Sequence, residues 1–576
     1  MDGRGLRYAM TAVIVLVAAP ILWVAGSVGA AESSSAVADA AMAKDGATVR
    51  ALLKRGADVN TAQGDGMTAL HWAARNGDAD LTSALLAAGA NVRATSRLGS
   101  YTPLHLAASA GAAPAIDALL RSGAPVDAAT ATGATPLMLA AKSGSVAAVD
   151  SLLTGGADPN HQESANGETA LMFAAAADRA DVIRSLTAHG AKPNLASAVV
   201  DISKLSAPEE RLQAAIREAQ SQPTKTVAGI VSAPPTPPTG TAGVTRAFTF
   251  DELIGRQGGL SALHFAARQG STASVHALVE QGADVNLSSA DGTTPLVIAT
   301  INGHYDTAAY LLEHGADPNR ASANGMTALY AALNIEWAPR MFYPQPRAQL
   351  QEKLSYLDLM TALLDKGADP NVRLTRKVWY TQYNFDLLRI DESGATPFWR
   401  AAYASDIAAM KLLVDHGADP TIPTMKPAGR TRVGDNEREN RETAALPPVP
   451  IGGPGMPALL AAAGAGYGEG FAANAHRFAP TGMLAAVKYL VEDLHADVNA
   501  QDAEGNTALH NAASRGDNEM IQYLVSKGAD VKVVNRMGQT TVDMANGPVQ
   551  RTQPYPETIK LLESLGAKNN HKCVSC

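Results

Sequence analysis

The sequence predicts an all-α solenoid of stacked helical hairpins with projecting turns, arranged in two blocks. Its 576 residues far exceed the roughly 250–300 at which one hydrophobic core stops growing, so the chain must hold several domains or a repeat array. A Thr-x-Leu-x tetrapeptide recurs at Thr68, Thr102, Thr135 and Thr169, which are 34, 33 and 34 residues apart. A second series begins at Ser261. The repeats carry a Leu-Leu-type pair and then a Gly-Ala-Asp-x-Asn stretch, as at residues 56–60, 282–286 and 315–319, and such a fixed period is typical of repeat folds.

Each repeat carries local signals for two short helices. Thr102 is a suitable N-cap, because its hydroxyl accepts a hydrogen bond from an unpaired backbone N–H. Pro103 follows it, with a ring that is pre-set for the first helical position. The small pair Ala107 and Ala108 continues an apolar stripe at helical spacing and lets a neighbour approach closely. Gly111 is placed to end this helix in a left-handed cap, and a second helix with paired leucines then packs on the first.

These motifs resemble the ankyrin repeat family, whose unit is a β-turn followed by two antiparallel helices over about 33 residues. We count twelve such units, five in residues 36–197 and seven in residues 258–570. The resemblance implies that the histidine in the fourth place of the motif ties neighbouring turns together through hydrogen bonds. These histidines are His71, His105, His264 and His510.

Several interruptions break the regular period. Residues 198–257 form a linker with a charged helix and a Pro-rich spacer. The two blocks can form one superhelix or two hinged arms, and a break of this length usually means two bodies. In a solenoid, insertions map to loops on one face, which is often the binding face. The insertions within the second block occupy about residues 335–353, 373–392, 424–455, 464–482 and 548–556.

The aromatic residues are concentrated in one region. Residues 330–403 contain 12 of the 28 aromatic residues of the chain. Tyr and Trp are common anchors of protein interfaces, although aromatic side chains can equally pack an insertion against the solenoid. Phe398 and Trp399 sit at helix core positions, which favours packing for them. The candidate partner-binding residues are Trp337, Tyr343, Trp379, Tyr380 and Tyr383.

The N-terminal residues 1–31 have the pattern of a secretory signal. Arg4 and Arg7 precede an apolar stretch, and small residues follow it, with a cleavage site expected after Ala30 or Ala31. An uncleaved anchor is the alternative, because the stretch approaches the length that spans a bilayer. Pro20 favours cleavage. In both cases we expect the body of the protein to be periplasmic or secreted, with membrane attachment only through this segment.

Composition and motifs argue for binding and against catalysis. A net charge of -8 and a pI near 5.9 are unlike those of nucleic-acid-binding proteins, which usually show a basic face. The sequence contains no nucleophile-elbow, zinc-protease or Walker motif. The Gly-Ala-Asp-x-Asn stretches lack the ligand spacing of a calcium loop. We therefore expect an exported scaffold that binds other proteins and has no catalytic residues, no metal site, no cofactor and no small-molecule substrate.

The C-terminal tail, residues 571–576, supports one alternative. Cys573 and Cys576 form a Cys-x-x-Cys pair, which would be a c-type haem attachment site if His followed. The chain is similar here to exported bacterial ankyrin proteins with Cys-x-x-Cys-His near or beyond the repeats. If the chain is a fragment, it would be the recognition portion of a haem electron-transfer protein. Because the histidine is absent, a free tail with a local disulfide is the favoured interpretation.

Overall fold

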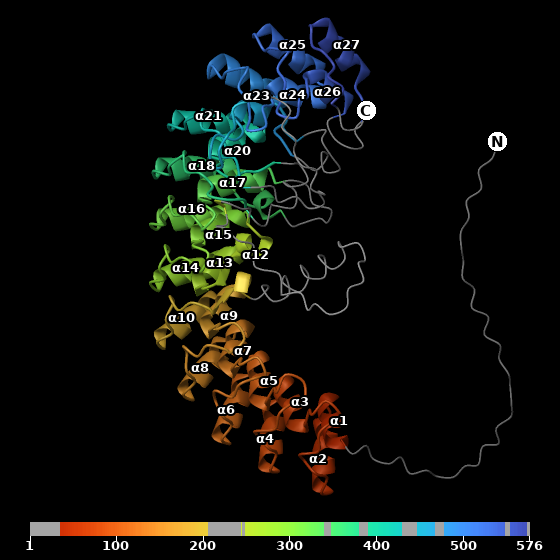
Figure 1. The fold of residues 1–576 in the computed structure, drawn as a ribbon. Helices are drawn as coiled ribbons and strands as arrows, with labels where there is room; N and C mark the ends of the chain where they lie inside the picture. The colour runs from red at the N-terminus through yellow and green to blue at the C-terminus, as the bar shows by residue number, and fades with distance from the viewer. Residues whose placement is uncertain are drawn as a thin grey trace, which may run out of the picture.

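In the computed structural model the described residues are 35–204, 243–244, 248–338, 347–378, 390–428, 446–466, 477–547 and 553–572. Almost all regular structure in them is helical, which confirms the predicted all-α repeat solenoid (Figure 1). No helix in this part of the chain has both the length and the apolar character needed to cross a membrane. The predicted N-terminal signal, the charged helix and the Pro-rich spacer of the linker lie outside the described residues.

The helices occur in consecutive pairs, each of which is one unit. The first five units are α1 (Ala36–Met42) with α2 (Gly46–Lys54), α3 (Ala69–Arg75) with α4 (Ala79–Ala87), α5 (Pro103–Ser109) with α6 (Ala113–Arg121), α7 (Pro136–Ser143) with α8 (Val146–Thr154), and α9 (Ala170–Ala176) with α10 (Ala180–Ala188). Two short strands, β1 (Val199–Asp201) and β2 (Arg256–Gly258), follow with helix α12 (Phe250–Ile254) between them.

Seven more units complete the stack. They are α13 (Ala262–Gln269) with α14 (Thr272–Glu280), α15 (Pro295–Ile301) with α16 (Tyr305–Glu313), α17 (Ala328–Glu336) with α18 (Tyr356–Asp365), α20 (Pro397–Tyr403) with α21 (Ile407–Asp415), α22 (Ala458–Ala462) with α23 (Met483–Lys488) and its continuation η3 (Tyr489–Asp493), α24 (Ala508–Ser514) with α25 (Asn518–Ser526), and α26 (Thr541–Asn546) with α27 (Pro556–Ser564). A short 3-10 turn, η1 (Ala348–Leu350), precedes α18.

The local signals act as the sequence suggests. At α5, Thr102 is the N-cap, Pro103 is the first helical residue, and Ala107 and Ala108 are 0% exposed. At α7, Gly144 closes the helix in the left-handed region with φ +88°. Because the first helix of each pair is thin and its alanines are buried, successive pairs approach closely and share one continuous apolar core.

An asparagine ladder joins the outer turns of successive units. Asn286 shows the pattern: its Nδ2 donates to the carbonyl of Gly315 at 2.9 Å, and its Oδ1 accepts from the N–H of Asp317 at 2.7 Å. The aspartate of each stretch accepts a bond from its own chain two residues on, so the Gly-Ala-Asp-x-Asn motif serves turn and stacking geometry. The same ladder bonds are made by Asn60, Asn160, Asn194, Asn319, Asn371 and Asn499.

A histidine in the fourth place of the motif joins neighbouring units on the other side. The His264 Nδ1 contacts the N–H and hydroxyl of Ser261, and its Nε2 lies 3.1 Å from the carbonyl oxygen of Thr293 in the next unit. His71, His105 and His510 make the equivalent contacts. Burial lowers the pKa of all four rings, to about 4 for His264 and His510, so they are neutral at pH 7.

The turn between two units is a finger, closed at its base by one backbone hydrogen bond. In the finger Ser289–Thr293 the N–H of Ser289 donates to the carbonyl of Thr293 at 2.9 Å. The next residue, Ala290, donates to Gly258 of the preceding finger, so the fingers form a row. The equivalent base bonds span Gln63–Met67, Ser96–Tyr101, Thr130–Ala134, Glu163–Glu168, Ser197–Leu260, Ser322–Met326, Leu374–Ala395, Thr424–Met456, Asp502–Asn506 and Asn535–Gln539.

The predicted linker is itself an enlarged finger. The N–H of Ser197 donates to the carbonyl of Leu260 at 2.9 Å, which is the same base bond as in the short fingers. β1 and β2 pair antiparallel directly above this base, with Val199 opposite Gly258. The chain therefore leaves and returns at one point, although about 60 residues lie between.

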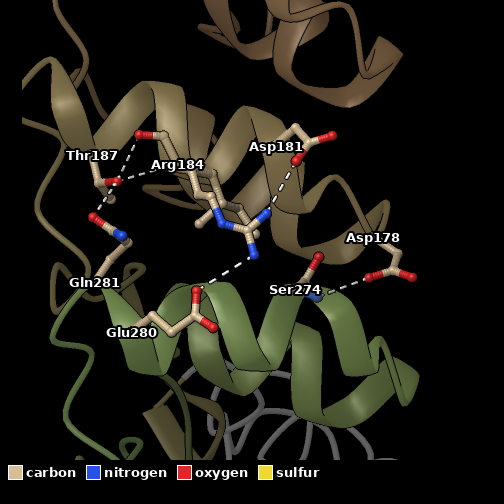
Figure 2. Close-up of polar contacts among 8 residues, drawn as sticks. Asp178, Asp181, Arg184, Thr187, Ser274, Glu280 and Gln281 are labelled. Atoms are coloured by element: carbon tan, nitrogen blue, oxygen red, sulfur yellow. Dashed lines mark hydrogen bonds and ion pairs between the residues drawn. The ribbon is translucent and has the colours of Figure 1, made fainter.

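The two blocks form one continuous curved stack, so the expectation of two separate bodies is wrong (Figure 1). Helix α10 packs on α14 as neighbouring second helices do elsewhere. The Arg184 guanidinium lies 3.4 Å from the Glu280 carboxylate, and Thr187 donates to Gln281 at 3.1 Å (Figure 2). The Asp178 carboxylate accepts from the N–H of Ser274 at 3.1 Å.

The insertions begin and end at two edges of the stack, and not on the single face that the sequence predicts. Those between Leu374 and Ala395 and between Thr424 and Met456 enlarge fingers, as the linker does. Those between α17 and α18, between α22 and α23, and between α26 and α27 enlarge the turn that joins the two helices of a unit. Because the first helix starts at the finger and ends at the helix–helix turn, these two places lie at opposite ends of it.

The buried histidines predict a pH dependence of stability. The pKa of His264 falls from 6.5 to about 4 on folding, because the buried ring is held neutral. The contribution of this ring to the free energy of unfolding is therefore complete above pH 6.5 and is lost as the pH falls toward 4. A shift of this size corresponds to about 3 kcal/mol. The difference in thermal stability between wild type and His264→Gln is therefore expected to be largest at pH 7 and to shrink by pH 5. The control is His189→Gln, at an exposed histidine. A stability difference between wild type and His264→Gln that does not depend on pH would contradict this interpretation.

The enlarged finger predicts that the linker is dispensable for stacking. One Asp in place of residues 199–258 gives the finger Ser-Ala-Asp-Gly-Leu, which matches Ser-Ala-Asp-Gly-Thr at residues 289–293. Gly259 and Gly292 already share the left-handed conformation, with φ +67° and +83°. The shortened chain is expected to keep its helical circular dichroism per residue and to unfold without a new transition. Two separated melting transitions would show that the blocks need the linker to stack.

Candidate protein-binding surface

A partly exposed apolar stripe runs along the finger-facing side of units 2 to 5. It consists of the residue after the fourth place of the repeat motif, on the first helix of each unit. Trp72 shows its orientation, because the indole Nε1 donates to the Gln63 side chain of the adjacent finger at 2.7 Å. The first helices lie on the inner side of the curve in Figure 1. This finger-facing stripe is formed by Trp72, Leu106, Leu139 and Phe173.

Polar and apolar groups border the stripe. One turn further along the same helices lie exposed residues, and two of them, Arg75 and Lys142, are basic. The Arg75 guanidinium lies 5.2 Å from the centre of the Trp72 ring. On the finger between units 2 and 3, Leu98 is 79% exposed and Tyr101 is 37% exposed. The surface therefore offers aromatic and aliphatic contacts beside positive charge, a composition suited to a protein segment.

The stripe continues into unit 6, where its residue is buried, and into unit 7, where it lies beside the linker. Phe265, at the position of Trp72, is 7% exposed. Ile298, the next in line, lines a hollow with Leu253 and Ile254, which belong to α12 of the linker. The first block thus presents the stripe to solvent, whereas unit 6 buries its stripe residue and unit 7 places Ile298 beside α12.

The sequence-predicted candidate residues are mostly beyond what the structure describes. Tyr343, Trp379, Tyr380 and Tyr383 lie outside the described residues, as do Cys573 and Cys576. Their proposed roles in partner binding and in haem attachment stay predictions from the sequence. Within the described residues, no group of three or more His, Cys, Asp or Glu side chains is arranged to hold a metal ion.

Trp337, the one candidate that is described, lies inside the stack. It is 9% exposed, and its indole Nε1 donates to Asp406 Oδ2 at 2.9 Å. The Tyr356 hydroxyl donates to the same oxygen at 2.6 Å, and the two rings meet edge to face. The Arg477 guanidinium lies 5.9 Å from the Trp337 ring. This placement favours the packing interpretation for Trp337, because little of its ring is left for a partner.

Trp337 belongs to a buried polar cluster that joins units 8 and 9. Arg400 is 0% exposed; its Nη2 donates to the Trp337 carbonyl at 2.9 Å and its Nε to Asn334 at 3.1 Å. Toward the fingers, Glu392 is 1% exposed, and burial together with the neighbouring Asp391 charge raises its pKa to about 7. Charged groups this deep stabilise a joint only when they are hydrogen-bonded, as Arg400 is through Nε and Nη2 and Glu392 is through the N–H of Val378.

The stripe residues were missed from the sequence, although a signal was present. The position after the fourth motif residue is bulky and apolar in units 2 to 5, while the two positions that follow it hold alanine. Helical periodicity alone assigns such a residue to the core. Only the fingers, which fold over one side of each first helix, show that this position is shared between core and surface.

Comparison with known proteins agrees with this fold. Family models described as ankyrin repeats match residues 37–130, 104–197, 263–338, 393–425 and 489–545. The chain belongs to the ankyrin repeat family. These matches lie on both sides of the enlarged finger.

Individual relatives match only short stretches. The chain is 40% identical over 88 residues to ankyrin repeat and SAM domain-containing protein 6 of Rattus norvegicus, covering 15% of this chain and 10% of that protein. It is 24% identical over 212 residues to alpha-latrocrustotoxin-Lt1a of Latrodectus tredecimguttatus, covering 37% and 10%. The chain thus spans about a tenth of the length of these curated relatives. The solved human ASB11 ankyrin repeat domain aligns with 49% of this chain and 98% of its own at 21% identity and a TM-score of 0.35.

The geometry at Trp337 predicts a stability role. Trp337→Phe keeps most of the ring but removes one hydrogen-bond donor to the buried Asp406 carboxylate. We therefore expect the free energy of unfolding to fall by about 1–3 kcal/mol. Trp72→Phe is the matched control, because it also removes an indole hydrogen bond but at a half-buried site, with an expected loss of roughly 0.5 kcal/mol. Chemical denaturation measures both. Equal, small losses for the two variants would argue against a core role of Trp337.

Proposed function

We propose that this protein is a scaffold that binds another protein through the finger-facing stripe of units 2 to 5 and performs no catalysis of its own. The observation that carries the proposal is the repetition of a partly exposed apolar side chain at one position in four successive stacked units. A row of this kind provides a long, rigid contact surface without any reactive group. Ankyrin repeats are typical protein-interaction modules, which supports the same conclusion.

The chemistry of the stripe defines the kind of segment that it would bind. The aromatic rings of Trp72 and Phe173 stand at its two ends, with leucine side chains between them. Arg75 and Lys142 lie beside it and favour acidic residues at the edge of a bound segment. We therefore infer a partner segment with an apolar face and flanking Asp or Glu. The aromatic insertion residues Tyr343, Trp379, Tyr380 and Tyr383 would provide a second contact region.

We also propose that the scaffold works outside the cytoplasm, in the periplasm or as a secreted protein. Support comes from the N-terminal sequence, in which Arg4 and Arg7 precede the apolar stretch and small residues follow. A fusion of residues 1–60 to a reporter enzyme that is active only after export tests this. The proposal is contradicted if the native segment gives no reporter activity while a known export signal in its place does.

Site-directed capture tests the binding surface. The full chain, carrying a photo-crosslinking amino acid at position 106, is used to trap partners from an envelope fraction, and the trapped protein is identified and purified. Its Kd is then measured against wild type and Trp72→Ala/Phe173→Ala. Loss of two anchors is expected to weaken binding by roughly 100-fold.

The control for this measurement is Leu350→Ala, an exposed apolar residue (67% exposed) in an insertion at the opposite edge. Its Kd is expected to stay at the wild-type value. An unchanged Kd for Trp72→Ala/Phe173→Ala would place the contact elsewhere, and alanine substitution of Tyr343, Trp379, Tyr380 and Tyr383 would then show whether the aromatic insertions provide it.

A further inference from the structure

The return arm of the enlarged finger, residues 248–258, lies against the finger-facing side of the second block. Its helix α12 is capped by Thr249, whose N–H donates to the Glu252 carboxylate at 2.9 Å while the Glu252 N–H donates to the Thr249 hydroxyl at 3.3 Å. Leu253 is 3% exposed, whereas Phe250 is 54% exposed. One side of this five-residue helix thus packs against the solenoid, and Figure 1 shows α12 beside α13 and α15.

The return arm is held from two sides. On one side, Leu253 and Ile254 share a hollow with Ile298 and Ile301 of α15. On the other side, Arg376 of the finger after unit 8 reaches back across it. The Arg376 Nη1 donates to the Glu252 carbonyl at 3.1 Å, and the guanidinium lies 5.3 Å from the Phe248 ring. The return arm therefore lies in a groove with an aliphatic wall and an arginine wall, which we name the unit-7 groove.

The unit-7 groove differs from the stripe of the first block at one position. Where α15 has Ile301, units 2 to 6 hold polar or small residues, namely Arg75, Ser109, Lys142, Ala176 and Arg268. Ile298 and Ile301 lie one helical turn apart and form an aliphatic pair. This pair faces the aliphatic pair Leu253–Ile254 of α12, so the groove is matched to the segment that it holds.

The return arm fills this groove incompletely. Hollows of about 140 and 210 Å³ lie on its two sides, and Leu253 and Arg376 line both of them. The Arg376 Nε is buried and has no hydrogen-bond partner among the described residues. A helix of five residues is also too short to be stable by itself in water, so its contacts with the groove hold it in shape. The groove thus has space and a free donor for a longer ligand.

We propose that the unit-7 groove is a second recognition site, for a short amphipathic helix that bears adjacent aliphatic side chains, and that residues 248–258 are its built-in occupant. A partner segment of that chemistry binds by displacing the return arm, laying its aliphatic side chains on Ile298 and Ile301 and offering a carbonyl or carboxylate oxygen to Arg376. This helix-in-groove mode goes beyond the proposed function, because it uses a different part of the solenoid.

Competition by a tethered occupant makes the proposal measurable. A segment attached to its own site is present at an effective concentration of about millimolar, so it excludes an untethered segment of similar affinity. Removing the aliphatic pair from the return arm should therefore open the groove to a ligand added in solution. The sequence of the return arm itself supplies that ligand.

The probe is a fluorescent peptide with the sequence of residues 248–259, titrated against the full chain. Binding to Leu253→Ala/Ile254→Ala is expected to be roughly tenfold or more tighter than to wild type. A peptide with the same two alanines is expected to lose binding. Adding Ile301→Asp to the opened protein is expected to abolish it, while Ser109→Asp, at the equivalent position of unit 3, should leave it unchanged.

Three results would overturn the proposal: no saturable binding to the opened protein, equal binding to opened and wild-type protein, or binding insensitive to Ile301→Asp. If Leu253→Ala/Ile254→Ala loses helical circular dichroism, the chain with one Asp in place of residues 199–258 replaces it, since that chain lacks the occupant altogether. Peptide binding that is lost in Trp72→Ala/Phe173→Ala would place the peptide on the first block and refute a unit-7 groove. No partner enters the assay, so failure here leaves the proposed function of units 2 to 5 intact.

Discussion

Contact between neighbouring helix pairs is the interaction on which the rest of this structure depends. A unit with a thin, alanine-rich first helix cannot bury its own apolar side, so it gains stability only from the pair before and the pair after it. The Asn286 ladder bonds and the His264 bridge act at that same boundary, and both satisfy backbone groups of the next unit. Each unit therefore fixes the position of its neighbour, and the curvature of the whole stack follows from this repeated joint.

The same constraint explains where the chain tolerates long insertions. The finger base needs only one short backbone bond, and the bond between Ser197 and Leu260 forms as well as that between Ser289 and Thr293. What lies between the two residues does not alter the helix pairs. The entropic cost of closing a loop rises only slowly with its length. A finger can therefore carry tens of residues without disturbing the stack. The helix–helix turn has the same freedom at the other end of the first helix.

The sequence was sufficient for the parts of the fold that repeat. Threonine caps, alanine pairs and the Gly-Ala-Asp-x-Asn stretches are local signals, and each acts in the structure as its chemistry requires. Phe398 and Trp399 are 1% and 0% exposed, as expected for core positions. Contacts between residues that are far apart in the chain cannot be predicted from such local signals. Nothing local marks Ser197 and Leu260 as partners, so the sequence alone predicts a linker at this place and not an enlarged finger. Trp337 has the composition of an interface anchor, but its environment is set by Asp406, 69 residues away.

The two blocks use equivalent positions for different purposes. Phe173 and Phe265 occupy the same place in units 5 and 6, yet the first is partly exposed and the second is 7% exposed. The repeat is the same, but the enlarged finger returns to the stack beside unit 7, where its Leu253 and Ile254 line a hollow with Ile298. An insertion that leaves the stack unchanged can thus still decide which part of a continuous surface is open. In a solenoid with nearly uniform units, specificity comes from what the insertions cover as much as from what the repeats present.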